Sequence, residues 1–288
     1  MEASELLKKV RKIEIKARGL TRQVFAGEYH SAFKGRGISF SEVRGYQYGD
    51  DIRSIDWNVT ARLNHPYVKV YEEERELTVM LLVDVSGSGN FGTRGAYKME
   101  QITEIAALLA FAAINNNDKI GVLFFSDRVE KFISPQKGRK HILRIIRELL
   151  DFKPLSTKTS LDEPLRYLTN ALKKRCTAFI ISDFMAGDFE RSLQIASNKH
   201  DVVGLRINDK MENELPDLGM VYFNDPETGD SLWLDTSLRS VREGFRKQRE
   251  AEMARLDDIF TRSGVDNVTV YTGDDYVRPL INLFKKRS

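Results

Sequence analysis

The stretch that decides the fold is TVMLLVDVSGS, residues 78–88. Residues 79–83 form an unbroken apolar run that is too short for an ordinary helix and rich in strand-forming residues. Such a run predicts a strand buried on both faces, as in the centre of a parallel sheet. The run stops at Asp84, so this carboxylate and the hydroxyls of Ser86 and Ser88 follow the strand at its carboxyl end. Ligands of open α/β sheets bind at this edge.

From Thr78 onward, candidate strands alternate with candidate helices. This alternation predicts a mostly parallel sheet with helices on both faces. The further strands expected are 119–125, 128–133 as an edge hairpin, 177–182, 201–207, a hairpin over 221–234, and 267–271. The helices expected are 98–115, 138–151, 160–174, 188–199, a long charged helix that ends near 263, and a last helix from 276. The predicted fold class is α/β and Rossmann-like.

The segment before this alternation has a different character. Residues 3–17 have the apolar spacing of an amphipathic helix, and its other face is basic. Residues 27–76 are interrupted by glycines and contain short strand-like pieces, which predicts a small β-rich lobe. We therefore predict two parts: 1–76 with the helix and the lobe, and 77–288 with the α/β domain. In the lobe we expect an interlocked network of Arg44, Asp50, Asp51, Arg53, Asp56 and Arg62 around Tyr46, Ile55 and Trp57.

The composition limits the possible classes of protein. A net charge of +3 over 288 residues is too small for a general nucleic-acid binder, so no nucleic-acid partner is expected. The single cysteine, Cys176, excludes an internal disulfide and a cysteine-based zinc cluster. Because no run approaches ~18 apolar residues and no signal-peptide core is present, we expect a cytoplasmic protein without a transmembrane segment. The basic first helix leaves peripheral membrane contact as an alternative, although packing on the domain is favoured.

Side chains with oxygen ligands follow several of the predicted strands. Asp183 ends the second strongly apolar strand, 177–182, and Thr159 lies in a hydroxyl-rich loop before a helix. Since the two most apolar strands should both be central, we expect Asp84 and Asp183 to reach the same crevice. Carboxylates and hydroxyls alone favour a hard cation, Mg²⁺ or Mn²⁺. The alternative is that these residues only cap helices and turns, but their joint occurrence at strand ends favours a metal site.

This pattern resembles a known metal site. Asp84, Ser86, Ser88, Thr159 and Asp183 match, residue by residue, the metal-ion-dependent adhesion site (MIDAS) of von Willebrand factor A domains. In that family the metal leaves one position open for an acidic residue of a partner protein. The resemblance implies a von Willebrand factor A-like domain in which these residues hold the metal, with Asp183 coordinating directly or through water.

The lobe adds a second resemblance. Its central segment, RGYQYGDDIRSIDWNVTAR (44–62), is similar to bacterial domain-of-unknown-function family 58, whose members join such a lobe to an A-type domain. Members are commonly found beside AAA+ ATPases of the MoxR type and often carry transmembrane helices, for which this sequence has no candidate. The resemblance implies that the partner presenting the acidic residue is a MoxR-type AAA+ ATPase.

Two competing motifs are weaker. Residues 87–92 read G-x-G-x-x-G after a strand, but the dinucleotide fingerprint requires a helix that begins within the glycines, and no helix is expected before Lys98. A metal-dependent phosphohydrolase could use the same oxygen ligands, with Lys158 and Arg94 stabilising developing charge. The four histidines are scattered, and no catalytic base or nucleophile is evident. We therefore predict a non-enzymatic module for protein–protein interaction.

Overall fold

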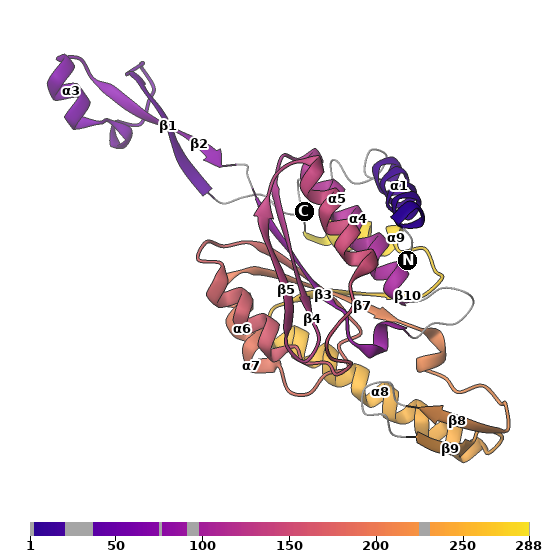
Figure 1. Ribbon diagram of the computed structural model, residues 1–288. Helices are drawn as coiled ribbons and strands as arrows, with labels where there is room; N and C mark the ends of the chain where they lie inside the picture. Colours follow the sequence, from indigo (N-terminus) through magenta and orange to yellow (C-terminus); the bar gives the residue numbers. More distant parts are fainter. Residues whose placement is uncertain (1–2, 21–36, 75–76, 91–97, 225–230, 288) are drawn as a thin grey trace. The chain divides into compact units, whose positions relative to one another are not determined.

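The computed structural model of the protein describes residues 3–20, 37–74, 77–90, 98–224 and 231–287 (Figure 1). These residues belong to two compact units. The small unit spans Lys34–Leu77, and the large unit combines Met1–Phe33 with Thr78–Ser288.

The large unit contains a six-stranded sheet in the order β10-β7-β6-β3-β4-β5. Its strands are β3 (Thr78–Asp84), β4 (Lys119–Phe125), β5 (Val129–Gln136), β6 (Thr177–Ser182), β7 (Asp201–Asn208) and β10 (Asp266–Tyr271). All neighbouring strands are parallel except β5, which runs antiparallel to β4 as an edge hairpin. The predicted α/β class and the central position of β3 and β6 are confirmed.

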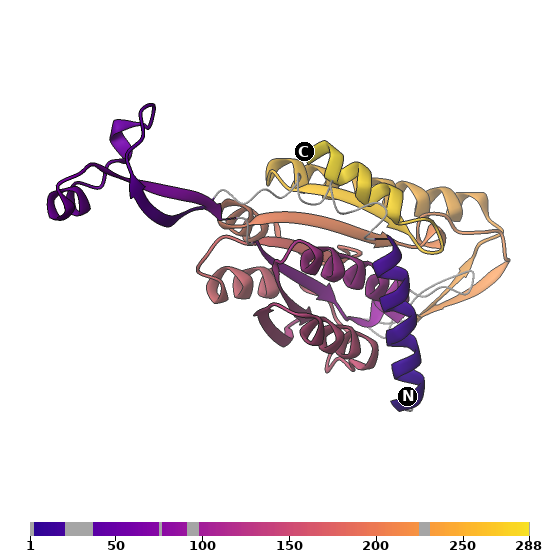
Figure 2. The same ribbon diagram turned by 90° about the horizontal axis from the view of Figure 1, so that it is seen from above.

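Helices cover both faces of this sheet (Figures 1 and 2). One face carries α4 (Lys98–Asn115), α5 (Arg139–Asp151) and α9 (Val277–Arg287), and the other carries α6 (Asp162–Ala171), α7 (Glu190–Lys199) and α8 (Arg239–Arg262). Because side chains alternate along a strand, Met80 and Leu82 enter one core with α6, α7 and α8. On the opposite face, Phe179 of β6 meets Phe284 of α9 edge to face, with ring centroids 6.4 Å apart. Burial on both faces explains the unbroken apolar run of β3.

The strand order places a topological switch point at β3. After β3 the chain adds β4 on one side, and it later adds β6 on the other side. Helical connections diverge at such a point and leave a crevice at the carboxyl ends of the two strands. Asp84 ends β3 and Asp183 directly follows β6, so the fold brings both carboxylates to this crevice.

Helix α1 (Ala3–Leu20) belongs to the large unit and packs on α4 and α5. Its residues Val10 and Ala17 are buried, and Glu14 accepts a hydrogen bond from Arg139 Nε of α5 at 2.9 Å. The structure therefore groups α1 with the α/β domain, whereas the sequence division assigned residues 1–76 to one part. None of the described helices is both long enough and apolar enough to cross a bilayer.

The small unit is an antiparallel pair, β1 (Gly37–Gly45) and β2 (Tyr67–Glu74), with the short helix α3 (Trp57–Leu63) between them. The expected interlocked network is only partly present. Arg44 pairs with Asp50 through two hydrogen bonds of 2.8 Å. Asp51 and Asp56 instead accept backbone N–H groups at the starts of a 3₁₀ turn and α3, because carboxylates satisfy the free donors of helix N-termini. Trp57 is 68% exposed and does not centre a network.

A second hairpin lies between β7 and α8. Its strands are β8 (Met220–Asn224) and β9 (Ser231–Asp235), which confirms the hairpin predicted over 221–234. The turn that joins the strands lies outside the described residues. The short 3₁₀ helix η4 (Lys210–Glu212) precedes this hairpin and follows directly from the carboxyl end of β7.

The close approach of β4, β3 and β5 depends on Gly121. A Cβ atom there would lie 2.7 Å from the Ile133 carbonyl oxygen and 2.7 Å from Met80 Sδ. We expect Gly121→Ala to lower the free energy of unfolding by about 1–3 kcal/mol, because a backbone atom of β5 must move. Gly244→Ala is the control: this α8 position has open space, so the change should stabilise by about 0.5–1 kcal/mol. Urea unfolding measures both, and a Gly121→Ala protein as stable as wild type would contradict the expected clash.

Candidate metal site

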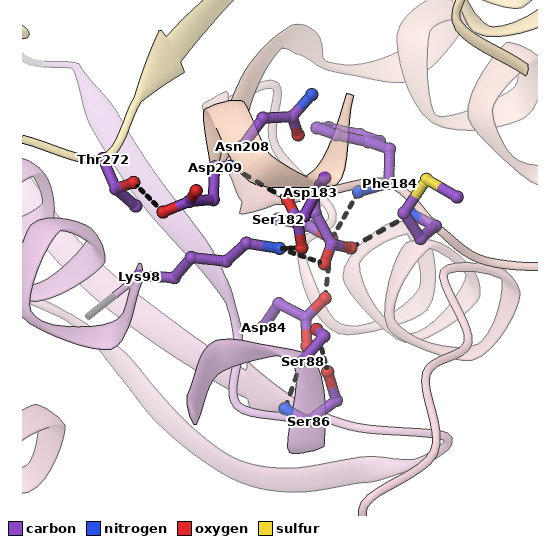
Figure 3. Close-up of polar contacts among 12 residues, drawn as sticks. Asp84, Ser86, Ser88, Lys98, Ser182, Asp183, Phe184, Asn208, Asp209 and Thr272 are labelled. Carbon is purple, nitrogen blue, oxygen red and sulfur yellow. Dashed lines mark hydrogen bonds and ion pairs between the residues drawn. The ribbon is translucent and has the colours of Figure 1, made fainter. Parts of the chain in front are cut away.

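The loop after β3 brings three of the predicted ligands together. The Asp84 carboxylate accepts a hydrogen bond from the Ser86 backbone N–H at 3.0 Å, which folds the chain back over the strand end. The hydroxyl oxygens of Ser86 and Ser88 lie 3.0 Å apart. Asp84 and Ser86 are buried and Ser88 is half-buried. The three side chains therefore present their oxygens from one tight turn (Figure 3).

The end of β6 supplies Asp183 and a residue that the sequence analysis missed, Ser182. The Ser182 hydroxyl donates to Asp84 Oδ2 at 2.6 Å and so ties the two central strands together. Asp183 is 5% exposed, and its Oδ1 accepts the Met185 backbone N–H at 3.1 Å. The structure thus places Asp84, Ser86, Ser88 and Asp183 in one polar cluster at the switch point.

The backbone after Asp183 adopts an unusual conformation. Phe184 has φ 59°, the left-handed region that a phenylalanine rarely occupies. Its N–H donates to Ser182 Oγ at 3.0 Å, and its ring packs edge to face on Phe260 with centroids 5.0 Å apart. Burial of this ring offsets the backbone strain, which fixes the turn that carries Asp183.

Thr159 belongs to a loop that is hydrogen-bonded to the turn after β3. The Gly87 N–H donates to the Thr157 carbonyl at 2.8 Å, and the Ser160 N–H donates to the Ser126 carbonyl at 3.0 Å. Thr159 lies between these two anchors and is half-buried. Its loop is therefore brought beside the Asp84 turn, although α6 begins at Asp162, later than the predicted 160.

Burial and charge perturb Asp84. Burial first, and then the negative charge of Asp183, raise the pKa of Asp84 to about 7, against hydrogen bonds from Ser182 and Ser86 that lower it. Two carboxylates that repel one another in a buried crevice favour either a proton or a cation between them.

A lysine already faces this crevice. Lys98, the first residue of α4, is 1% exposed, and its Nζ donates to Asp183 Oδ2 at 3.0 Å. The same Nζ also pairs with Glu212 of η4. Burial alone would lower the pKa of Lys98, but the charges of Asp183 and Glu212 outweigh it and raise that pKa above its ordinary value. Lys98 is therefore a buried ammonium that pairs with both carboxylates, and Figure 3 shows its side chain reaching towards Asp183.

The donor set fits a hard divalent cation. The Asp84 oxygens accept hydrogen bonds from the Ser86 N–H and the Ser182 hydroxyl. A carboxylate has about four lone-pair sites, so it can accept these bonds and still bind an ion. The oxygens of Ser86, Ser88 and Asp183 add neutral and anionic ligands of the kind that Mg²⁺ and Mn²⁺ prefer. The described residues contain no cluster of three or more His, Cys, Asp or Glu side chains in a metal-binding arrangement, so hydroxyls must complete this set.

The remaining nucleophilic and basic side chains lie elsewhere. Cys176 Sγ and His200 Nδ1 are 3.4 Å apart, a pair that the sequence did not suggest, but they lie at the opposite end of β6. Burial raises the pKa of Cys176 to about 12 and lowers that of His200 to about 4. Both groups are neutral near pH 7, so they form no thiolate nucleophile. Of the two cations considered for charge stabilisation, Lys158 is exposed and Arg94 lies outside the described residues.

Comparison with known proteins identifies relatives of the whole chain. The chain is 28% identical over 283 residues to the uncharacterized protein Rv1480 of Mycobacterium tuberculosis, which covers 96% of this chain and 88% of that protein. Among solved structures it is similar to an aerotolerance-related membrane protein from Bacteroides fragilis, with a TM-score of 0.50, 13% identity, and coverage of 73% and 98% of the two chains. It is also similar to the SpRpn10 VWA domain, with a TM-score of 0.40, 14% identity, and coverage of 72% and 94%.

The likeness to the Bacteroides fragilis protein concerns the fold alone. The family is given by the sequence: residues 42–255, which include both the small unit's central segment and the candidate metal site, match the family described as "Protein of unknown function DUF58". The chain belongs to the DUF58 family.

Proposed function

We propose that this protein is a non-enzymatic interaction module that binds a partner protein through a divalent metal held by Asp84, Ser86, Ser88, Thr159 and Asp183. The observation that carries the proposal is the meeting of Asp84 and Asp183 with the Ser86 and Ser88 hydroxyls at the switch point of the sheet. The resemblance of this ligand pattern to the adhesion site of von Willebrand factor A domains supports the role as an interaction module.

The site has few negative charges for a doubly charged ion. Asp84 and Asp183 are its two carboxylates, and the ammonium of Lys98 already pairs with Asp183. Bound Mg²⁺ or Mn²⁺ would supply a positive centre whose shell a carboxylate from another protein can complete. This chain's residues orient that contact: the turn at Ser86 and the loop at Thr159 hold neutral oxygens beside the two aspartates.

A binding role fits the chemistry better than turnover. Histidine is the commonest general base of hydrolases, and the two described histidines that pack beside the sheet are engaged elsewhere. His141 contacts the Ile120 carbonyl at 2.9 Å, and His200 contacts Cys176. Neither of these histidines lies at the carboxyl end of β3 or β6.

The proposed partner is a MoxR-type AAA+ ATPase, as the resemblance of the 44–62 segment implies. We expect immobilised ATPase to bind the wild-type protein in Mg²⁺ and to release it in EDTA. Thr159→Ala should weaken the contact by about tenfold or more, because it removes an oxygen ligand from a loop and opens no core cavity. The measurement is surface binding of both proteins with Mg²⁺ and with EDTA.

Thr157→Ala is the matched control for this experiment. Thr157 lies in the same loop with an exposed side chain, and it holds Gly87 through its backbone carbonyl, which the substitution keeps. It should bind the ATPase as wild type does. Equal affinities for wild type and Thr159→Ala, in Mg²⁺ and in EDTA, would show that no metal takes part in the contact.

A further inference from the structure

The buried Lys98–Glu212 pair is not part of the ligand set, yet it touches that set directly. Lys98 Nζ lies 3.0 Å from Asp183 Oδ2, and the side chains of Lys98 and Asp183 are 2% and 3% exposed. A lysine that is this deeply buried needs compensating charge. Helix α4 does not provide this negative charge, because Lys98 is its first residue and lies at the positive end of the helix dipole.

Glu212 is held rigidly in its place opposite Lys98. Its Oε2 accepts the Asp209 N–H at 2.9 Å in a capping box, and its backbone carbonyl accepts from Arg249 Nε at 2.8 Å. The side chain is 17% exposed. The Asp209 N–H thus orients the carboxylate, and Arg249 holds the backbone that carries it, so the charge of Glu212 lies at a defined position beside Lys98.

We propose that Lys98 is a resident counter-cation that sets how tightly the site holds a divalent metal, and that Glu212 moderates its effect. This inference rests on the proposed metal site and adds two residues that determine its affinity. The Lys98 ammonium competes for Asp183 Oδ2 and repels a second cation in the same crevice. Glu212 offsets part of that positive charge. The net charge of the Lys98–Glu212 pair therefore determines how strongly Asp84 and Asp183 attract a metal ion.

The proposal predicts opposite signs for two single substitutions. Lys98→Met should tighten Mn²⁺ binding by at least about tenfold, since it removes a unit charge from within a few ångströms. Glu212→Gln should weaken Mn²⁺ binding by about tenfold, because the Glu212 carboxylate then no longer offsets the positive charge of Lys98. The double variant Lys98→Met/Glu212→Gln should lie between the two single variants.

Lys210→Met is the matched control. Lys210 lies on the same short helix as Glu212 and pairs with Asp274, but both side chains of that pair are exposed, at 48% and 44%. Removing this lysine changes the net charge by the same amount and should leave the affinity for Mn²⁺ unchanged, since exposed charges are screened.

The experiment is calorimetric titration of the full chain with Mn²⁺, alongside thermal melts in EDTA. Lys98→Met leaves Asp183 and Glu212 without their shared cation, so it is expected to be less stable than wild type. If Lys98→Met does not fold, Glu212→Gln and the double variant, which removes both members of the pair, still test the proposal.

The outcomes separate this inference from the metal site itself. If the Mn²⁺ affinities of the variants follow the predicted order, the metal site and the role of Lys98 are both supported. If wild type binds Mn²⁺ and all variants bind it equally, the role of Lys98 is overturned while the metal site stands. If Lys98→Met binds and wild type does not, Lys98 excludes the metal and the proposed function fails. If no variant binds, both are overturned.

Discussion

Replacing Asp84 by asparagine is expected to abolish binding of Mg²⁺ or Mn²⁺ and also to stabilise the metal-free protein above pH 7. The first effect follows from the ligand set, since Asp84 is one of two carboxylates and these ions depend on anionic oxygen. Asparagine keeps the shape of the side chain and an oxygen that can accept the Ser86 N–H. The loss is therefore one of charge, with little change in packing.

The second effect follows from the raised pKa of Asp84, which is about 7 in the folded protein against 3.8 for an ordinary aspartate. A group with a raised folded pKa contributes stability below its unfolded pKa and loses it as pH rises through the folded value. Above pH 7 the ionised Asp84 therefore destabilises the metal-free fold by up to about 4 kcal/mol. Asparagine carries no charge, so the Asp84→Asn protein does not lose this stability above pH 7.

Melts and calorimetry at pH 5 and pH 8 would test both effects. In EDTA, the Asp84→Asn protein should be more stable than wild type at pH 8, and the difference should shrink towards pH 5. Added Mn²⁺ should stabilise wild type through binding to the native state and leave the variant unchanged. Asp127→Asn is the control, because this acid pairs with Arg128 on a nearby loop and its side chain is 30% exposed. Equal Mn²⁺ affinity in wild type and Asp84→Asn would remove Asp84 from the site.

The framework of the site could be predicted because it follows from burial. The apolar runs of β3 and β6 identify central strands, and polar residues that end central strands must meet at one edge. Asp84 and Asp183 were found in this way. Ser182 was missed because a serine that ends an apolar strand gives no sign that its hydroxyl bonds to the neighbouring strand.

The charged residues around the site could not be predicted in the same way. Lysine is normally exposed, so nothing in the sequence marks Lys98 as buried, and its partner Glu212 lies far along the chain. The Cys176–His200 contact could not be predicted either, because it forms only when the β6–α7–β7 connection returns His200 to the start of β6. Such pairs depend on the register of neighbouring elements, which periodicity does not specify.

A fragment that contains only the small unit, Lys34–Leu77, is expected to show no cooperative unfolding transition. Among the side chains that the structure describes in this unit, Val68 is the buried apolar one, at 2% exposure. Four of its large apolar side chains are exposed: Tyr48, Ile52, Trp57 and Leu63. A two-stranded ribbon with one short helix is marginal in water, and segments near ~40 residues rarely fold without a disulfide or metal.

Local contacts do not change this expectation. Asp51 and Asp56 cap short helical turns, and the Arg44–Asp50 pair is substantially solvated. Caps and solvated ion pairs of this kind contribute little to stability. Ordering the backbone of one residue costs about 1–2 kcal/mol, so these contacts cannot order the whole segment.

The large unit supplies the complementary test. Its core cluster, which includes Met80, Leu82, Ile180 and Phe260, comes entirely from residues after Thr78. A chain in which a flexible glycine–serine linker replaces residues 34–77 should therefore melt cooperatively and bind Mn²⁺ as the full chain does. Dispersed amide resonances and a cooperative melt from the isolated small unit would contradict the first expectation. Loss of the cooperative melt in the linker variant would instead show that the α/β core requires the small unit, because that variant keeps every residue of the buried cluster.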